Sequence, residues 1–193
     1  MTPFTFTAPI ETERLRLRLF RPGDAPAVHA YQSREDVCQF LLYSPRTLEE
    51  VQTKLAEYAQ RTQLAADQDF LQLAVEHRES QAVLGEMVFV LRSTVNQTAE
   101  LGWVFHPDQH GNGYASEAAR ALLALGFETI GLHRIVAELA PQNTASVRLC
   151  ARIGMREEAH FVRDILVDGQ WEDTGVHAML REEWNGARQQ PLM

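Results

Sequence analysis

The stretch QHGNGYA at 109–115 joins a predicted strand at 99–105 to a predicted helix at 114–130. Along that helix, apolar residues recur every three or four positions, which is the spacing of a buried helical face. The glycines at 111 and 113 permit a positive φ, and the unpaired N–H groups that open a helix favour an anion. The turn therefore predicts either a phosphate or pyrophosphate site or a tight glycine turn that only starts a helix. It is neither a Walker loop, which needs Gly-Lys-Ser/Thr, nor a dinucleotide fingerprint, which needs a third glycine.

The segments around this turn mix strands and helices. A strand at 134–140 follows the helix, so 99–140 forms a βαβ unit with two parallel strands. We therefore expect an α/β (α+β) fold, with a mixed, mostly antiparallel sheet of about seven strands flanked by four helices. The other predicted elements are a strand at 14–20, a helix from Asp24 through Tyr31, a helix from the Thr47–Glu50 capping box to about residue 66, a hairpin of strands at 70–76 and 83–91, a helix at 144–153, and two strands around an Asp168-Gly169 turn.

Length and composition favour one soluble domain. The chain has 193 residues, of which 45% are hydrophobic and 23% charged, and it can bury a core without disulfides or metals. We place the domain at 10–186, after an N-terminal extension at 1–9 and before a tail at 187–193. No apolar run approaches the roughly 20 residues that span a bilayer, and the first residues lack the pattern of a secretory signal. We therefore expect a cytoplasmic protein with no membrane partner.

Charge and cysteine content narrow the partners further. The formal net charge of −8 disfavours nucleic acid, because surfaces that track phosphates need clustered Lys and Arg. The dense basic run RLRLRLFR at 14–21 alternates with Leu and is typical of a solvated strand face. Cys38 and Cys150 lie far apart in the chain and form neither a disulfide framework nor a zinc pattern, and no histidine set has ligand spacing, so we expect no metal.

Several motifs, in matching order, resemble one family. ELGW at 100–103, HGNGYASEA at 110–118, NTAS at 143–146 and IGM at 153–155 are similar to the GNAT acetyltransferases. TERLRLR at 12–18 with Asp24, and DGQW at 168–171 with Asp173, resemble its RimJ/RimL branch, which acetylates the N-termini of ribosomal proteins. The resemblance covers roughly residues 10–184 and implies a GNAT-like sheet whose central βαβ unit holds acetyl-CoA.

The resemblance also implies which residues hold the cofactor. In that family the signature Gln/Arg-x-x-Gly-x-Gly/Ala grips the pyrophosphate through backbone amides. It falls here on His110, Gly111, Asn112, Gly113, Tyr114 and Ala115, with His110 at the Gln/Arg position. The strand at Trp103, Val104 and Phe105 would pair with the pantetheine arm, and Asn143 and Ser146 would hydrogen-bond the cofactor beyond the next strand.

Acetyl transfer to an amine needs a neutral amine, a polarised thioester carbonyl and a proton for the leaving thiolate. Glu100, on the strand beside the thioester, is the first candidate for the base, directly or through water; the alternative is a solvent-facing strand glutamate. Glu86 and Glu158 are weaker candidates. A strand amide near Trp103 or Val104, at a bulge allowed by Gly102, is the candidate for polarising the carbonyl.

The proton donor departs from the common family pattern. Many members have a tyrosine seven residues after the Asn, and here that position is Cys150. Ser146 fills the role in the RimJ/RimL branch and is the predicted acid, the alternative being a serine that only satisfies the start of a helix. Cys150 is either a covalent acyl carrier or, as we predict, buried and inert.

The expected function is transfer of an acetyl group from acetyl-CoA to a primary amine, in first place a protein N-terminal α-amino group, by direct attack in a ternary complex. Two alternatives stay open. One is an acetyltransferase for a small amine such as a polyamine, an amino acid or an antibiotic, and the other is a non-catalytic acetyl-CoA sensor. By resemblance the acceptor loops lie around 33–47 and 160–176, and a homodimer is possible.

Overall fold

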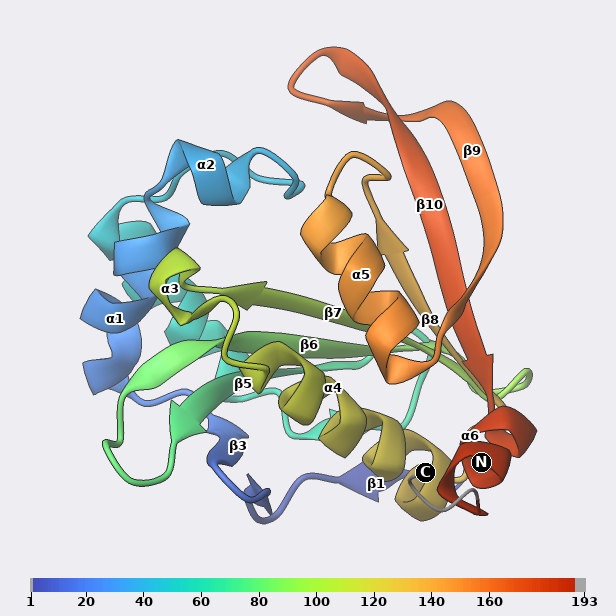
Figure 1. The fold of residues 1–193 in the computed structure, drawn as a ribbon. Helices are drawn as coiled ribbons and strands as arrows, with labels where there is room; N and C mark the ends of the chain where they lie inside the picture. The colour runs from blue at the N-terminus through green and yellow to red at the C-terminus, as the bar shows by residue number, and fades with distance from the viewer. Residues whose placement is uncertain (1, 190–193) are drawn as a thin grey trace.

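The protein is described by a computed structural model over residues 2–189, with the backbone alone for 186–189 (Figure 1). The helices are α1 (Ala25–Gln32), α2 (Glu35–Cys38), α3 (Leu48–Tyr58), α4 (Tyr114–Ala124), α5 (Thr144–Ile153) and α6 (Arg181–Gln189), with short helical turns η1 (Pro22–Asp24), η2 (Pro107–Gln109) and η3 (Leu125–Ile130). The strands are β1 (Phe4–Thr5), β2 (Ile10–Glu11), β3 (Leu15–Leu19), β4 (Gln63–Leu64), β5 (Phe70–His77), β6 (Val83–Ser93), β7 (Thr98–Phe105), β8 (Arg134–Leu139), β9 (Arg156–Val167) and β10 (Gln170–Leu180).

One large sheet organises these elements. Within the described residues it has eight strands in the order β2-β3-β5-β6-β7-β8-β10-β9, against about seven predicted. Neighbouring strands are antiparallel except β7 and β8, which are parallel and joined by α4 and η3. The predicted fold class and its central βαβ unit are therefore confirmed. The added strand, β2, is two residues long and has no alternating pattern of its own.

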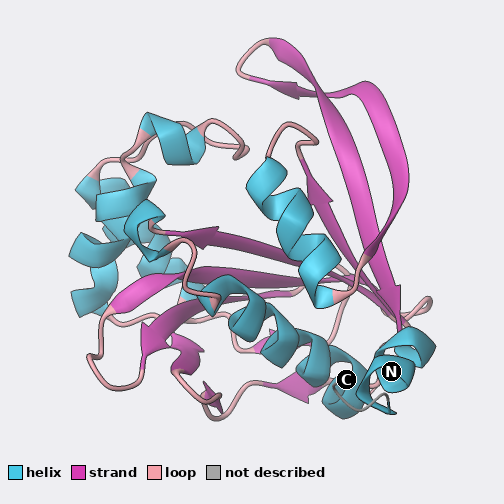
Figure 2. Ribbon diagram, viewed as in Figure 1, coloured by secondary structure: helices cyan, strands magenta, loops and turns pink. Residues whose placement is uncertain are grey.

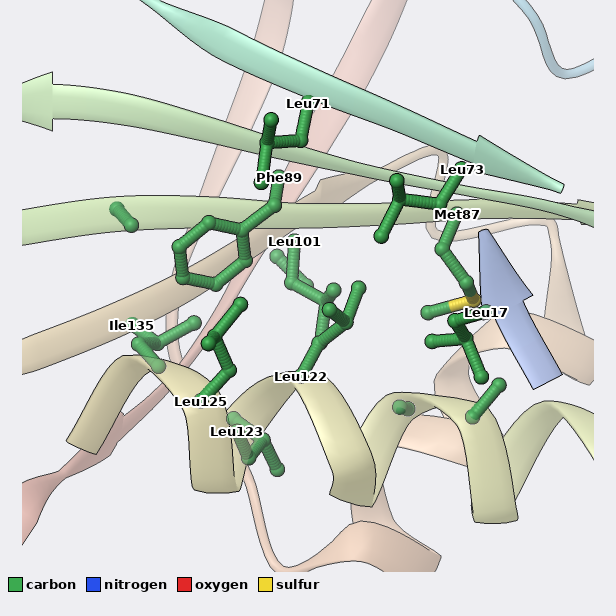
Figure 3. Packing of buried hydrophobic residues seen from close by; sticks show 14 of the residues in the cluster. Leu17, Leu71, Leu73, Met87, Phe89, Leu101, Leu122, Leu123, Leu125 and Ile135 are labelled. Atoms are coloured by element: carbon green, nitrogen blue, oxygen red, sulfur yellow. The ribbon is translucent and has the colours of Figure 1, made fainter. Parts of the chain in front are cut away.

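Helices cover both faces of the sheet (Figure 2). On one face, Leu122 of α4 points toward Phe89 of β6 and Leu101 of β7 in the larger core, which Figure 3 shows. On the other face, Val28 of α1 belongs to a smaller cluster formed with α3 and β5. None of the helices in the described part of the chain is long and apolar enough to cross a membrane.

Local signals correctly placed several boundaries. The Thr47–Glu50 capping box is present, with Thr47 N–H donating to Glu50 Oε2 (2.8 Å) and Glu50 N–H donating to Thr47 Oγ1 (3.3 Å). The hairpin turn at Asp168 and Gly169 has positive φ at both residues, +46° and +79°, which is the type I′ geometry that an Asp-Gly pair favours. Gly154 ends α5 with φ +90°.

The second predicted helix is shorter than expected. It was predicted to reach about residue 66, but α3 ends at Tyr58 and the chain then forms β4. The residues after Ala59 are polar up to Gln63, so no apolar face continues the helix, and Leu64 is buried instead as part of a strand. That strand pairs with β1, through Phe4 opposite Leu64.

The chain ends differ from a simple extension and tail. Residues 4–5 form β1, and Phe6 is buried in the larger core, so part of the predicted extension at 1–9 packs against the domain. Residues 187–189 of the predicted tail continue α6, and 190–193 lie outside the described residues.

The basic run at 14–21 is not a solvated strand face throughout, so that prediction was wrong. Arg18 is only 4% exposed and donates to Asp24 Oδ2 (2.7 Å) and, from Nε, to Glu76 Oε2 (2.7 Å). An arginine has enough reach and enough donors to satisfy two carboxylates inside a protein. Asp24 also accepts from the Arg21 N–H (2.7 Å), so the cluster fixes the turn between β3 and α1.

Gly85 provides a test of how closely β6 and β7 pack. A Cβ at this position would lie 2.4 Å from the Val104 carbonyl oxygen and 2.8 Å from Phe105 Cα, both backbone atoms that cannot yield without moving the strand. We expect Gly85→Ala to lower the free energy of unfolding by about 3 kcal/mol or to prevent folding. Gly23→Ala is the control, since no atom lies within 4 Å of its Cβ. Equal denaturation midpoints for the two variants would contradict this packing.

Candidate active site

The two central strands separate partway along their length. β7 and β8 pair only at three positions, Thr98 with Arg134, Ala99 with Ile135 and Glu100 with Val136. Beyond them β7 continues to Phe105 and β8 to Leu139 without pairing to each other, and Figure 1 shows the strands diverging. Each strand therefore presents an unpaired backbone edge, which can bind an extended ligand that carries amides.

The glycine turn lies between β7 and α4. Gly111 and Gly113 have φ of +81° and +79°, which confirms that both positions need a left-handed backbone. Gly113 is the N-cap of α4, and the N–H groups of 111–116 have no acceptor among the described residues. His110 donates from Nε2 to the Phe105 carbonyl (3.3 Å), so its ring holds the turn against the end of β7. This geometry favours an anion at the start of α4.

A contact from the N-terminal segment holds this turn in place, and sequence reasoning missed it. Arg14 donates from Nη1 to the Asn112 carbonyl (3.0 Å) and from Nε to Glu117 Oε2 (2.7 Å), and its guanidinium lies 4.7 Å from the centre of the Tyr114 ring. Thr12 Oγ1 donates to Glu117 Oε1 (2.5 Å). Burial alone would raise the pKa of Glu117, but these donors lower it below the ordinary value. Two sequence features could have suggested this contact: Arg14 begins the basic run, and Glu117 is an acidic residue in the first turn of α4.

A groove runs alongside the contact between Arg14 and Glu117. It has a volume of about 650 Å³ and begins at Gly113, between the segment leading into β3 and the exposed side of α4. Arg120 and Arg152 line it; Arg120 donates to the Arg152 carbonyl (2.7 Å) and Arg152 donates to Ser116 Oγ (3.3 Å). Neither guanidinium has an ion-pair partner within the described part of the chain, so both keep donors for a further anion.

Ser146 lies across the open strands from β7. Trp103 donates from Nε1 to Ser146 Oγ (3.1 Å), which links β7 to the first turn of α5. An indole N–H is only a donor, so Ser146 accepts here and its own hydrogen stays free to donate elsewhere. Asn143 is the N-cap of α5, and its Oδ1 accepts from the Ser146 N–H (3.1 Å). The Asn143 amide nitrogen keeps its donors. The two hydrogen bonds bring together Trp103, Asn143 and Ser146, three residues predicted to contact the cofactor.

The predicted base has a charged partner. Glu100 forms an ion pair with Arg92, which also donates to Glu138 Oε2 (2.9 Å). Burial raises the pKa of Glu100, and the guanidinium of Arg92 partly opposes that shift. Glu158 pairs with Arg134 and Arg156, and the hydrogen bond from Arg134 is the main reason that its pKa is lowered. Glu158 is therefore the least suitable of the three carboxylates as a base.

Glu86 has a different environment. It is 3% exposed, accepts from Tyr31 Oη (3.1 Å) and accepts from Gln32 Nε2 at both oxygens (2.9 and 3.1 Å). Burial raises the pKa of Glu86 to about 7, although the hydrogen bonds from Tyr31 and Gln32 and the charge of Arg46 act to lower it. Glu86 lies opposite Val104, in the part of β7 whose other edge, toward β8, is unpaired.

Two further predictions are resolved at this site. Cys150 is buried, as predicted, and burial raises the pKa of its thiol to about 12, which disfavours a role as acyl carrier. The bulge expected at Gly102 is wrong, because the pairing of β6 with β7 runs without a shift through Val88 opposite Gly102. A Cβ on Gly102 would lie 2.7 Å from Val88 Cγ1, so the glycine makes room for that side chain.

The two segments predicted as acceptor loops approach each other. β9 and β10 form an arm that extends above the body of the domain in Figure 1. At its tip, Asp168 Oδ2 accepts from Ser44 Oγ (3.3 Å), in the loop between α2 and α3. The expected loops at 33–47 and 160–176 therefore meet on the side of the sheet that carries Glu86.

Comparison with known proteins identifies the family. Residues 14–156 match the acetyltransferase (GNAT) domain. The uncharacterized N-acetyltransferase YnaD of Bacillus subtilis (strain 168) is 35% identical over 176 residues, which are 91% of this chain and 99% of that protein. The crystal structure of a GNAT-family acetyltransferase from Bacillus anthracis has a TM-score of 0.81 at 34% identity, covering 90% of this chain and 99% of that chain. The chain belongs to the GNAT acetyltransferase family, whose fold binds acetyl-CoA, and it is an acyl-CoA-dependent N-acetyltransferase.

More distant relatives differ in acceptor. Spermidine N-acetyltransferase from Vibrio cholerae, solved in complex with CoA and spermine, has a TM-score of 0.75 at 20% identity, covering 90% of this chain and 99% of that chain. The [ribosomal protein uS5]-alanine N-acetyltransferase of Escherichia coli (strain K12) is 33% identical over 88 residues, which are 46% of this chain and 45% of that protein. Their names point to different acceptors, so membership of the family does not define the acceptor of this enzyme.

The buried Glu86 carboxylate should make stability depend on pH. Its pKa is about 7 in the folded protein and 4.5 as an ordinary glutamate, so between these values the folded state holds a proton that the unfolded state has lost. Stability contributed by that proton is present below about pH 4.5 and is lost as the pH rises to 7. We expect the free energy of unfolding of Glu86→Gln, relative to the native protein, to increase by up to about 3 kcal/mol between pH 4.5 and 8. Urea titrations at several pH values measure this difference, and a pH-independent difference would contradict the assignment.

Proposed function

We propose that this enzyme transfers the acetyl group of acetyl-CoA to a protein N-terminal α-amino group, by direct attack within a ternary complex. The observation that carries the proposal is the unpaired edge of β7 at 101–105, which lies between the glycine turn and Ser146. The motifs at both ends of the domain that resemble the RimJ/RimL branch favour an N-terminal acceptor, as does the partial match to an enzyme named for a ribosomal protein.

Each part of acetyl-CoA has a matching feature in this arrangement. The pyrophosphate would accept from the free N–H groups of Gly111 to Ala115, in the turn that starts at His110, and the pantetheine amides would pair with the edge of β7 at Trp103, Val104 and Phe105. Asn143 would donate from its amide nitrogen. The guanidinium groups of Arg120 and Arg152, which form no ion pair within the described residues, suit a further phosphate of the cofactor.

The chemistry requires a proton acceptor and a proton donor. We assign the acceptor to Glu100, acting through water, because burial raises the pKa of this carboxyl on the strand beside the thioester. The amine nitrogen then attacks the thioester carbonyl carbon, a C–N bond forms and the C–S bond breaks. The Ser146 hydroxyl, which accepts from Trp103, would hydrogen-bond the departing sulfur, and a proton lost by the attacking amine completes the free thiol. An amide of β7 near Val104 would polarise the carbonyl.

The first test of the cofactor assignment is Gly113→Glu. A side chain at φ +79° strains the turn, and a carboxylate there would repel the pyrophosphate. We expect acetyl-CoA binding, measured by calorimetry, to weaken by at least about a hundredfold. Gly169→Glu is the matched control, because it also has φ +79° but lies at the tip of the distant β9–β10 hairpin. Near-native affinity in Gly113→Glu would refute the pyrophosphate assignment.

The acceptor class is tested by following free thiol with acetyl-CoA and a panel of N-terminal peptides, lysine peptides and small amines. We expect release to depend on a peptide with a free α-amino group. In the same assay Glu100→Gln should lower turnover by about a hundredfold or more while leaving acetyl-CoA affinity intact, with Glu158→Gln as the control. Release only with small amines would favour a polyamine-type or similar acceptor, and binding without release from any acceptor would favour a sensor.

A further inference from the structure

Two glutamates are buried on the same side of the sheet, and only one of them has a counter-charge. Glu76 is 2% exposed and pairs with Arg18 (2.7 Å) and Arg16 (3.2 Å). Glu86 is 3% exposed, and its direct partners Tyr31 and Gln32 are both neutral. A buried carboxylate without a cation lowers stability, so the Glu86 arrangement has no structural advantage over an apolar side chain.

The hydrogen-bond donors around Glu86 favour its charged form and oppose the effect of burial, which raises its pKa to about 7. Tyr31 and Gln32 of α1 donate to both carboxylate oxygens. The nearest cation, Arg46, donates to Gln32 Oε1 (3.1 Å) and therefore acts through the amide, without contacting Glu86. Gln72 of β5 also favours the charged form. The carboxylate thus has hydrogen-bond donors in place, but no positively charged group contacts it directly among the described residues.

Tyr43 completes this environment on the side of the acceptor loop. Its hydroxyl is buried without a hydrogen-bond partner among the described residues, and its pKa is raised by burial first and then by the charge of Glu86. Arg46 stacks on the Tyr43 ring, with its guanidinium carbon 3.6 Å from the ring centre, and so fixes the ring. A free phenol oxygen can accept one hydrogen bond while the carboxylate accepts another. An alkylammonium group, with three N–H donors and one positive charge, matches this set.

We propose that Glu86, with Tyr43, binds the protonated primary amine of the acceptor beside β7, so that Glu86 is a specificity-determining residue. This inference rests on the proposed function, because it assigns the acceptor's place at the same site. Glu86 lies opposite Val104, within the part of β7 that pairs with the pantetheine arm in that function, and the loop at 33–47 supplies Tyr43. The ammonium proton leaves later, to the acceptor assigned to Glu100.

Binding should follow the ionisation of Glu86. The groups that face it are Tyr31 and Gln32 from α1, Tyr43 and Arg46 from the loop before α3, and Gln72 from β5, while His106 lies edge-on to Tyr31 at 6.4 Å. With the pKa of Glu86 at about 7, acceptor affinity should fall about tenfold per pH unit below that value. Tyr31→Phe removes a donor to the charged form, so it should move this break to higher pH, an effect that loss of packing alone would not produce.

The test measures acceptor binding without turnover. Calorimetry with the CoA-saturated protein, titrated with a peptide bearing a free α-amino group or with a small primary amine, gives the dissociation constants. Glu86→Gln should weaken binding of the preferred amine by about ten- to a hundredfold and abolish its dependence on pH. Tyr43→Phe should weaken it several-fold, the exposed control Glu79→Gln should have no effect, and CoA affinity should be unchanged in all of them.

The outcomes separate this inference from the proposed function. If the native protein releases thiol with an amine and Glu86→Gln, folded by circular dichroism, binds that amine as tightly as the native protein, the inference is wrong and the function stands. If amines bind through Glu86 without thiol release, the inference stands and the enzymatic function is wrong. The preferred probe, peptide or small amine, identifies the source of the ammonium group. If no amine binds to the CoA complex, both are wrong.

Discussion

The arrangement of this site depends on where the parallel ladder between β7 and β8 stops. Strands twist relative to one another, and three residue pairs hold the two halves of the sheet together at one end. Past Glu100 and Val136 the halves separate, and two sets of backbone groups are left without partners. A ligand that offers amide groups can restore that pairing, so in the proposed function the cofactor would complete the sheet as well as deliver a reactive group. Helices α4 and α5 then present their first turns to the same opening.

Two arginines, one in β3 and one just before it, connect this opening to the rest of the molecule. Arg14 joins the glycine turn to the N-terminal segment, and Arg18 joins the strand to the turn before α1 through Asp24 and Glu76. Both carry charge into places where an apolar residue would leave carboxylates unpaired. Their positions explain why a basic run that alternates with leucine belongs to the architecture of the site, although the arginines touch no reacting atom.

Sequence reasoning succeeded where the signals are local. The capping box at Thr47, the Asp168-Gly169 turn and the glycines of the phosphate-type turn each specify a backbone geometry within a few residues, and all are present. The end of α3 was misjudged, because the apolar helical spacing stops at Ala59 and Leu64 is buried as part of a strand. The Arg14 to Glu117 contact joins residues 103 apart, and the donors to Glu86 come from a helix more than fifty residues away. No periodicity within one segment specifies such pairs, which depend on how the elements pack.

The positions of the tryptophans have a practical consequence. The chain has three, and they are distributed over three regions. Trp103 is hydrogen-bonded to Ser146 at the opening, Trp171 is 59% exposed on the β9–β10 arm, and Trp184 stacks near Phe127 and donates to Glu128 (2.8 Å). Their surroundings differ in polarity and in solvent contact, so their emission should differ in wavelength and in quenching. The protein thus contains its own optical reporters: one for the opening between β7 and β8, one for the arm and one for the docking of its last helix.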